Sequence, residues 1–447
     1  MRRQDSQKIN TRILLLSSVA GFAALLYSAQ AAHASGFGLR EGAADWLGNA
    51  FAGDEAKAYD ASTVWSNPAG MALLDSNEFQ GNLSVIAPYI KFHGSNTNVL
   101  TGSNVTGTQG GNDIAPAATG AMFGVYALAP NWRLGVSVTA PYGERTAYPD
   151  NWVGRYQSIV SSITDINMGL ALSYKVNDQL SIGGGPNFDY FQARLTQALN
   201  AATVVGGTPV DLSALYGDPI AQITGNSIGV GYNLGALYQF DDKTRIGIDY
   251  RSRIRHDLYG AQNVTAPAAY GSNFVPLDTA GTTSITLPDS VSMGIFSQVT
   301  PQLALLGSLQ WTEWSLFKQL DVTARNGSGN TAIVENYRDT WFAAVGANYQ
   351  LTDKILLQTG FAYDESPVTS AWRTSRVPDA DHYDLGIGVQ YKLTPAATIE
   401  AAYGHVFTLG GKINNSAAGG SNLTPGTLTG SYDLADNSAT LGLDVKF

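Results

Sequence analysis

The chain has 447 residues, a formal net charge of −10, 44% hydrophobic residues, 14% charged residues and no cysteine. Soluble domains usually carry about 25% charged residues, so this composition is unusual for a cytosolic enzyme. Plentiful apolar and aromatic residues exclude a disordered chain, and the missing cysteines exclude a disulfide scaffold or a thiolate metal site. The length predicts either two or three globular domains or one large β-barrel.

The first 34 residues have the three parts of a secretory signal. Basic residues open the segment, an apolar run follows from Ile13 to Leu26, and Ala32-His33-Ala34 provides a small-residue cleavage site. A membrane anchor is the alternative, but this run is shorter than the roughly 20 residues that span a bilayer. We therefore expect residues 1–34 to be removed as a signal peptide. The basic residues are Arg2, Arg3, Lys8 and Arg12.

Residues 35–77 lack the alternation of a β-strand, because glycine, alanine and aspartate are scattered through them. Their apolar side chains need a surface to pack against. We therefore expect this segment, called the hatch below, to be a plug inside a larger structure, with a mobile N-terminal tail as the alternative. The apolar residues are Leu39, Trp46, Leu47, Phe51, Trp65, Met71 and Leu73.

Several segments after the hatch place apolar residues at every second position. The clearest are 164–176 and 383–392. Runs of about ten alternating residues are typical of outer-membrane β-barrels, in which one face of each strand meets lipid and the other meets the lumen. The same alternation also fits the half-buried sheet of a soluble β-sandwich.

The connections between these segments favour the barrel. Outer-membrane barrels join their strands by short turns on the periplasmic side and by longer loops outside. Seven long loops imply fourteen strands within 78–447, with a third strand over 131–142 and one uninterrupted strand over 302–326. The short turns lie at 129–131, 176–178, 241–243, 300–302, 352–354 and 394–396, and the long loops at 94–115, 143–163, 198–221, 259–280, 327–331, 366–379 and 412–429.

The chain ends in an alternating strand whose last residue is aromatic. Leu441, Leu443 and Val445 alternate with small or charged neighbours before Phe447. This ending resembles the C-terminal signal that bacterial barrel-assembly machinery recognises. That machinery is therefore an expected partner, through Phe447.

Short motifs follow one another along the chain: Ser35-Gly36-Phe37, Gly48–Gly53, Asn67-Pro68-Ala69, Trp152–Tyr156, Leu287–Ser290, Trp311–Trp314, Gly360–Val368 and Val377–Asp379. In this order they resemble landmarks of the FadL family of outer-membrane fatty-acid and hydrocarbon transporters, over essentially the whole mature chain. The resemblance implies an all-β membrane protein of the bacterial outer membrane, a 14-stranded antiparallel transmembrane β-barrel (78–447) with its hatch (35–77) in the lumen. It also implies a monomer without enzyme activity, cofactor or metal, surrounded by outer-membrane lipid and lipopolysaccharide.

The resemblance further implies passive uptake of long-chain fatty acids or related hydrophobic compounds. Each buried methylene group favours an apolar site by about 0.8 kcal/mol, so a water-filled pore serves such a molecule poorly. In the family, an apolar groove between the third and fourth outer loops, here 198–221 and 259–280, captures the substrate. Packing of the two loops on each other is the alternative. The groove candidates are Leu199, Val204, Val205, Leu212, Leu215, Tyr216, Tyr270, Phe274, Val275 and Leu277.

A cation inside the barrel is expected to meet the substrate carboxylate, because arginine suits bidentate recognition of carboxylates. By resemblance, the candidates are Arg194 and Arg338. The alternative for each is an ion pair with a lumen carboxylate such as Asp189 or Asp339.

The resemblance also implies that movement of the hatch and a kink in the third strand open a sideways route into the bilayer. Pro141 lies near the outer end of the predicted third strand. Proline removes a donor from the hydrogen-bond ladder, so it indicates a local disruption there.

Three alternative functions stay open. An aromatic hydrocarbon channel of the same family would take toluene-like or xylene-like molecules. An outer-membrane barrel enzyme could use His93 or His256, although no Gly-x-Ser-x-Gly elbow is present. A general porin would have loops that only narrow a water-filled channel.

Overall fold

The computed structural model describes residues 35–98, 101–111, 116–205, 208–273, 277–327, 330–415 and 426–447. The predicted signal peptide at 1–34 lies outside these ranges. Among the described residues, no helix is both long enough and apolar enough to cross a bilayer.

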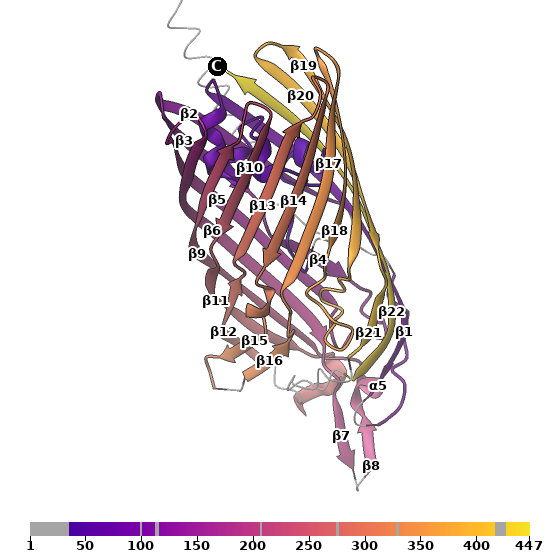
Figure 1. The fold of residues 1–447 in the computed structure, drawn as a ribbon. Helices are drawn as coiled ribbons and strands as arrows, with labels where there is room; N and C mark the ends of the chain where they lie inside the picture. Colours follow the sequence, from indigo (N-terminus) through magenta and orange to yellow (C-terminus); the bar gives the residue numbers. More distant parts are fainter. Residues whose placement is uncertain are drawn as a thin grey trace, which may run out of the picture.

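Fourteen antiparallel strands form a closed barrel, which confirms the predicted fold (Figure 1). Along the first strand, Phe79, Val85 and Tyr89 are exposed on the outer surface, whereas the alternate residues Gln80, Asn82, Ser84 and Ile86 are buried. Eight spanning strands are continuous: β1 (Glu78–Thr97), β2 (Ala117–Ala129), β5 (Val160–Lys175), β6 (Leu180–Ala198), β9 (Ile220–Gln239), β18 (Ile355–Asp364), β19 (His382–Thr394) and β22 (Thr427–Lys446).

The other six spanning strands are each divided into two segments by a short break. They are β3 (Trp132–Thr139) with β4 (Gly143–Ala147), β10 (Thr244–Arg251) with β11 (Ile254–Thr265), β12 (Leu277–Leu287) with β13 (Ser290–Gln298), β14 (Leu303–Thr312) with β15 (Gln319–Ala324), β16 (Asn330–Val334) with β17 (Thr340–Thr352), and β20 (Ala397–Thr408) with β21 (Gly411–Asn414).

Two of these breaks correct the sequence-based strands. The predicted strand over 302–326 is interrupted by a 3-10 turn, η3 (Trp314–Leu316), which turns the Trp314 ring into a buried aromatic cluster. The predicted third strand over 131–142 ends at Thr139 and resumes at Gly143, with Pro141 in the gap. All six predicted short turns are confirmed as connections between neighbouring strands.

The barrel closes between its first and last strands. β1 pairs with β22 over their whole lengths, from Glu78 opposite Lys446 to Thr97 opposite Thr427. The backbone N–H of Phe447 also donates a hydrogen bond to the carbonyl of Asn77 (2.9 Å). The chain end is therefore fixed beside the residue at which the hatch joins the wall.

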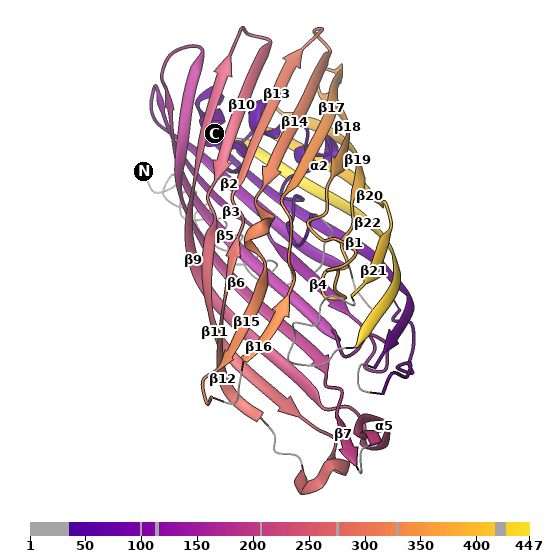
Figure 2. The same ribbon diagram turned by 60° about the horizontal axis from the view of Figure 1, so that its bottom comes forward.

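The hatch lies inside the barrel near the short-turn end (Figure 2). Its elements are too short to be stable alone, so packing against the wall holds them in place. They share one apolar core with wall residues such as Phe123, Phe296 and Phe342. The elements are α2 (Ala44–Gly48), α3 (Asp54–Lys57), α4 (Thr63–Ser66) and η1 (Pro68–Leu73).

The opposite end of the barrel carries the longer loops. The third of them contains a small hairpin and a helix, which project beyond the barrel at the bottom of Figure 1. The fourth contains a 3-10 segment. These elements are β7 (Ala202–Val205), β8 (Thr208–Asp211), α5 (Leu212–Tyr216) and η2 (Ala268–Asn273).

Candidate functional site

Asn67 anchors the hatch to the barrel wall. Its side-chain amide donates hydrogen bonds to the carbonyl oxygens of Glu55 (2.8 Å) and Ala236 (3.0 Å), and its side-chain oxygen accepts one from the N–H of Ala69 (3.1 Å). Pro68 begins η1, where a missing N–H leaves no hydrogen bond unmade. The predicted hatch motif therefore joins the hatch to β9. Two serines of β5 and β6 add hydrogen bonds to the Ala69 carbonyl: Ser173 and Ser181.

Glycines of the wall let the hatch backbone approach closely. A Cβ atom at Gly360 of β18 would overlap the carbonyl of Asn49, and one at Gly247 of β10 would overlap the carbonyl of Glu55. Only glycine allows backbone to meet backbone in this way. The seated part of the hatch therefore leaves no passage for a substrate at these contacts.

A buried lysine balances part of the negative charge inside the hatch. The Lys57 ammonium lies 2.9 Å from Asp45 Oδ2 and 2.7 Å from Asp54 Oδ1. Burial alone would lower the pKa of Lys57, but the two carboxylates raise it. Burial also raises the pKa of Asp54 to about 7, against the opposing effect of Lys57. Lys57 therefore stays charged and holds α2 against α3.

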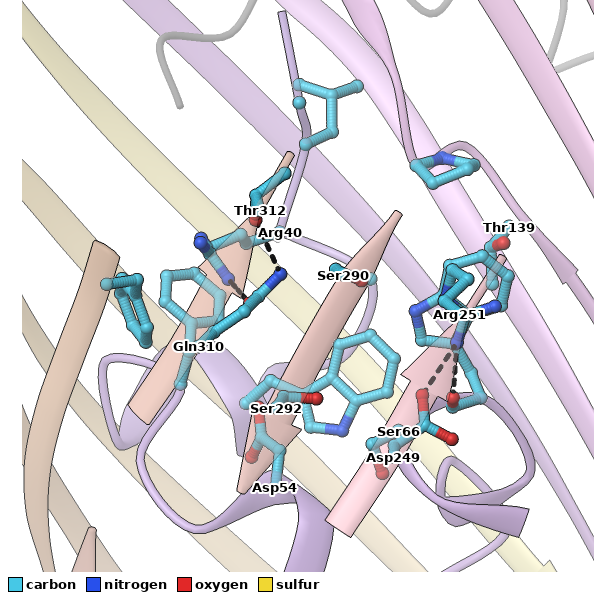
Figure 3. A pocket seen from close by; sticks show the side chains of 18 of the residues that line it. Arg40, Asp54, Ser66, Thr139, Asp249, Arg251, Ser290, Ser292, Gln310 and Thr312 are labelled. Atoms are coloured by element: carbon cyan, nitrogen blue, oxygen red, sulfur yellow. Dashed lines mark hydrogen bonds and ion pairs between the residues drawn. The ribbon is translucent and has the colours of Figure 1, made fainter. Parts of the chain in front are cut away.

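A cavity of about 170 Å³ lies between the hatch and the wall, next to the break in the third strand. Two arginines face it, Arg40 from the hatch and Arg251 from β10, and Figure 3 shows Ser290 and Ser292 between them in that view. Apolar rings of Trp46, Trp65, Trp314 and Phe342 complete much of the lining. This cavity, called the cationic cavity below for its two arginines, combines aromatic walls with these guanidinium groups and with the carboxyl groups of Asp54, Glu55 and Asp249.

Arg251 has spare hydrogen-bonding capacity in the cationic cavity. Its Nη2 donates to the carbonyl of Trp65 (2.7 Å), its guanidinium lies 3.5 Å from the Trp65 ring centroid, and Asp249 is 3.8 Å away. Its Nη1 is buried and has no hydrogen-bond partner within the described part of the chain. Leaving such a donor unpaired is costly, so an anionic guest would be stabilised there.

Arg40 is held more completely by its neighbours. Its Nε lies 3.3 Å from Asp364 Oδ2, its Nη1 donates to Gln310 Oε1 (2.7 Å), and its guanidinium lies 3.9 Å from the Phe342 ring centroid. These contacts fix the arm of the hatch, residues 35–43, against β14 and β18. Arg40 therefore contributes mainly its positive charge to the cavity, and not a free hydrogen-bond donor.

A second, apolar cavity of about 50 Å³ lies nearer the long loops. It is lined by side chains that point into the lumen from β5, β6, β9, β11, β12 and β15, together with Phe317, and is called the apolar cavity below. The buried ring of Phe37 packs 4.8 Å from Trp314, which lines the cationic cavity, and 5.7 Å from Phe317. Phe37 therefore lies between the two cavities. The main apolar residues that line the apolar cavity are Ile163, Phe191, Leu195, Ile223, Leu258, Ile285, Leu320 and Val322.

The arm of the hatch supplies backbone hydrogen bonds at the break in the third strand. The N–H of Leu39 donates to the carbonyl of Pro141 (2.8 Å), and the N–H of Gly143 donates to the carbonyl of Phe37 (2.9 Å). Described pairing between β2 and the third strand extends only as far as Met122 opposite Val138. The arm therefore takes the place of a wall strand at this point.

The structure places Arg194 outside the lumen. Its neighbours Ala193 and Leu195 line the apolar cavity, and successive side chains of a strand point to opposite faces. Arg194 is exposed and therefore faces outward. The lumen position predicted for it is wrong by one residue of register.

Arg338 is also exposed, in the break between β16 and β17. It donates to the carbonyl of Ser366 (3.0 Å), and its Nη2 lies 3.4 Å from Asp381 Oδ1. It does not line either cavity. The ion pairs suggested as the alternative for the two arginines are not formed with these aspartates: Asp189 contacts His256, and Asp339 accepts a hydrogen bond from the N–H of Ser315.

The third and fourth outer loops touch each other. The rings of Tyr216 and Tyr270 lie 5.4 Å apart, and the Tyr270 hydroxyl donates to the carbonyl of Gly217 (2.9 Å). Leu215 is 64% exposed beside them, while Leu199, Leu212 and Leu277 are partly exposed. Phe274, Val275 and the side chains of Val204 and Val205 lie outside what the structure describes. Packing between the loops and an exposed apolar surface therefore coexist.

His93 and His256 do not share a site. His93 is exposed on β1 and lies 3.2 Å from Asp433, whereas His256 is fully buried in β11 and lies 3.2 Å from Asp189. Each histidine therefore has its own aspartate on a different part of the barrel.

Comparison with known proteins identifies the family. The model of the outer membrane protein transport family (OMPP1/FadL/TodX) matches residues 25–447. The chain belongs to this family. Relatives named long-chain fatty acid transport protein include one from Escherichia coli O6:H1, 30% identical over 89% of this chain and 92% of its own, and one from Salmonella typhi, 29% identical over 91% and 95%. The protein is accordingly an outer-membrane protein.

Solved structures of this family share the fold. A FadL homologue from Pseudomonas aeruginosa matches with a TM-score of 0.81 and 24% identity over 92% of this chain and 100% of its own. The toluene transporter TbuX from Ralstonia pickettii matches with a TM-score of 0.67 and 19% identity over 91% and 99%.

Sequence reasoning missed Arg40 and Arg251 as lumen cations. The sequence held a signal for Arg251. It lies two residues from Asp249 on the same strand, so both side chains point to the same face, and a carboxylate is expected to avoid lipid. No comparable pattern exists around Arg40, since the arm of the hatch has no regular period.

Proposed function

We propose that the protein is a passive outer-membrane channel for long-chain fatty acids or related hydrophobic compounds. The observation that carries this proposal is the succession of an apolar cavity and a cationic cavity in the lumen, separated by Phe37. Such a sequence of sites matches a molecule with a long apolar tail and one anionic end. The names of the fatty-acid-transporting relatives support the same substrate class.

Capture would begin at the apolar surface of the third and fourth outer loops. The exposed Leu215 and the Tyr216–Tyr270 pair belong to this surface. The tail would then enter the apolar cavity, where each methylene group gains about 0.8 kcal/mol by leaving water.

The carboxylate would bind Arg251 in the cationic cavity. Its unpaired Nη1 offers the donor, and the aromatic walls exclude water and strengthen the interaction. Arg40 would add a second positive charge. This assignment replaces Arg194 and Arg338, which do not line either cavity.

Exit would follow displacement of the arm of the hatch. Loss of the hydrogen bonds at Pro141 and Gly143 would free the break in the third strand for sideways release into the bilayer. The rest of the hatch can stay seated during this step, because Asn67 anchors a different part of it.

An aromatic hydrocarbon channel is the second candidate. The lining of the apolar cavity supports it, as does the likeness of the fold to a solved toluene transporter. A toluene-like molecule would need no arginine. The two candidates therefore differ in whether Arg251 contributes to binding.

The remaining assignments belong to the same proposal. Residues 1–34 would be a cleaved signal, 35–77 the hatch and 78–447 the barrel, and the chain would act as a monomer without enzymatic activity or cofactor. Outer-membrane lipid and lipopolysaccharide would surround it. Barrel-assembly machinery would recognise Phe447, which is 71% exposed at the end of β22.

Competition binding to the purified protein tests the substrate class. Labelled oleate should bind saturably, oleyl alcohol of the same chain length should compete weakly, and toluene should compete least. Tighter binding of toluene than of oleate would favour the aromatic channel. Equal binding of oleate and oleyl alcohol would contradict a role for the carboxylate.

A further inference from the structure

A polar cavity of about 510 Å³ lies at the short-turn end of the barrel, between the hatch and seven strands of the wall. Asp60 of the hatch and Glu400 and Asp444 of the wall line it. This cavity lies away from the cationic and apolar cavities and shares no lining residue with either. The proposed substrate path makes no use of it.

Three buried carboxylates converge beside this cavity. Asp45 of α2, Asp60 and Glu400 of β20 each offer one oxygen, and these oxygens lie within 4.8 Å of one another. Their residues are 1%, 4% and 2% exposed. Two of the carboxylates come from the hatch and one from the wall, so the cluster joins the two parts of the chain.

Lysines lie near this cluster, but in the described ranges only Asp45 of the trio is ion-paired; Lys354, Lys392 and Lys446 line the polar cavity. Among the ion pairs of the described ranges, Lys57 contacts Asp45 and Asp54, and Lys446 contacts only Glu78. Within the same ranges, Asp60, Glu400 and Asp444 have no ion pair. One lysine beside several buried carboxylates leaves an excess of negative charge, which is unfavourable unless a further cation or protons offset it.

Two further residues beside the trio each have a buried oxygen without a hydrogen-bond partner among the described residues. Asp444 is 3% exposed, lines the polar cavity with Asp60 and Glu400, and leaves its Oδ1 without a partner. Gln80 is fully buried, pairs directly with Asp444 across the strands, and donates through Nε2 to Glu400 Oε2 (3.3 Å). Its Oε1 likewise has no partner among the described residues.

Oxygens of the trio are themselves available. Lys57 occupies Oδ2 of Asp45, and Ser62 donates to Oδ1 of Asp60. The other oxygen of each carboxylate, Asp45 Oδ1 and Asp60 Oδ2, is buried without a partner among the described residues. Neighbouring groups therefore hold each side chain in place and leave one oxygen free.

We propose that Asp45, Asp60 and Glu400, supported by Asp444 and Gln80, form a calcium site that fastens the hatch to the barrel wall. All the donors are oxygens, which hard divalent cations prefer. Calcium accepts six to eight oxygens at about 2.3–2.6 Å in flexible geometry, whereas magnesium demands a near-ideal octahedron and keeps several waters, so an all-protein set of carboxylate and amide oxygens favours calcium. The three oxygens lie within 4.8 Å of one another, close enough to bind one ion together. Asp60 and Glu400 both line the polar cavity, which gives an ion an approach from the short-turn end of the barrel.

Isothermal titration of the full-length purified protein, stripped with EDTA, tests this site with calcium alone. Saturable binding of about one ion per chain is expected, together with a higher unfolding temperature in calcium than in EDTA. Asp60→Asn and Glu400→Gln should weaken calcium binding by at least about ten-fold, a loss that even outer-shell changes can produce. Asp353→Asn, in an exposed turn, is the matched control and should bind as the wild type does.

Absence of saturable calcium binding in the wild type would overturn the site, as would equal affinity in both variants and the control. Tighter binding of magnesium than of calcium would overturn the assignment of the ion. Heat-modified mobility on gels reports whether each variant is folded. If Glu400→Gln does not fold, Asp60→Asn and the wild-type stoichiometry decide the matter.

Discussion

The ring of Phe37 meets the ring of Phe317 edge to face, with 5.7 Å between the centroids and perpendicular planes. Phe37 belongs to the arm of the hatch, and Phe317 lines the apolar cavity. Because Phe37 also contacts Trp314 of the cationic cavity, one hatch side chain separates the two lumen spaces.

We expect Phe37→Ala to connect the two cavities. Truncation of a buried phenylalanine typically removes about 3–5 kcal/mol of packing, and here the loss would fall on the arm rather than on the barrel. Oleate uptake and small-ion conductance in planar bilayers should both rise. Phe79→Ala, on the lipid-facing surface, is the control, and unchanged conductance in Phe37→Ala would show that Phe37 is no barrier.

Arg251→Gln should weaken oleate binding by roughly 10- to 100-fold, because a hydrogen bond to a charged group contributes about 1.5–3 kcal/mol. Binding of oleyl alcohol should change little. Arg338→Gln removes an arginine that lines neither cavity and should leave both affinities unaltered. Equal losses for oleate and oleyl alcohol would mean that Arg251 supports the cavity structurally instead of meeting the carboxylate.

Asn67→Ala should loosen the hatch. The change removes three hydrogen bonds of about 1 kcal/mol each, two of them from the side-chain amide to the carbonyls of Glu55 and Ala236. Limited proteolysis should cut within 35–77 faster than in the wild type. Asn131→Ala, in an exposed turn, provides the control, and equal cleavage rates in the two variants would argue against an anchoring role.

Gly360→Ala should displace the hatch from β18. The added methyl group would overlap the Asn49 carbonyl, and overpacking of this kind costs about 1–3 kcal/mol. We expect a lower unfolding temperature and noisier single-channel currents. Gly81→Ala is the matched control, since its Cβ would come no nearer than 3.7 Å to Phe79. Indistinguishable behaviour of the two variants would disprove tight seating.

Strand count and topology were predictable because they depend on periodicity and on turn chemistry. The alternating segment 164–176 corresponds to β5. The short turns at 176–178 and 394–396 connect neighbouring strands, as predicted. The two corrected strands were less readable. Trp314 and Pro141 interrupt their strands to make contacts with the arm of the hatch, which no local pattern reveals.

The register of Arg194 could not be read from polarity. Near the short-turn end of β6, the inward residues Ser181 and Asn187 are polar, as the usual rule for barrels expects. Farther along the strand, the apolar residues Phe191 and Leu195 point inward, because they line the apolar cavity. The rule reverses within one strand, so a polar residue at position 194 was placed on the wrong face.

The seam between β1 and β22 has a consequence for assembly in the membrane. The hatch is covalently continuous with the start of β1, and the last residue of the chain hydrogen-bonds to Asn77 at that junction. The final strand therefore docks next to the point where the hatch emerges. If the hatch enters before β1 and β22 pair, it does not have to pass through a closed barrel. Docking of the hatch and closure of the barrel can then be one cooperative event.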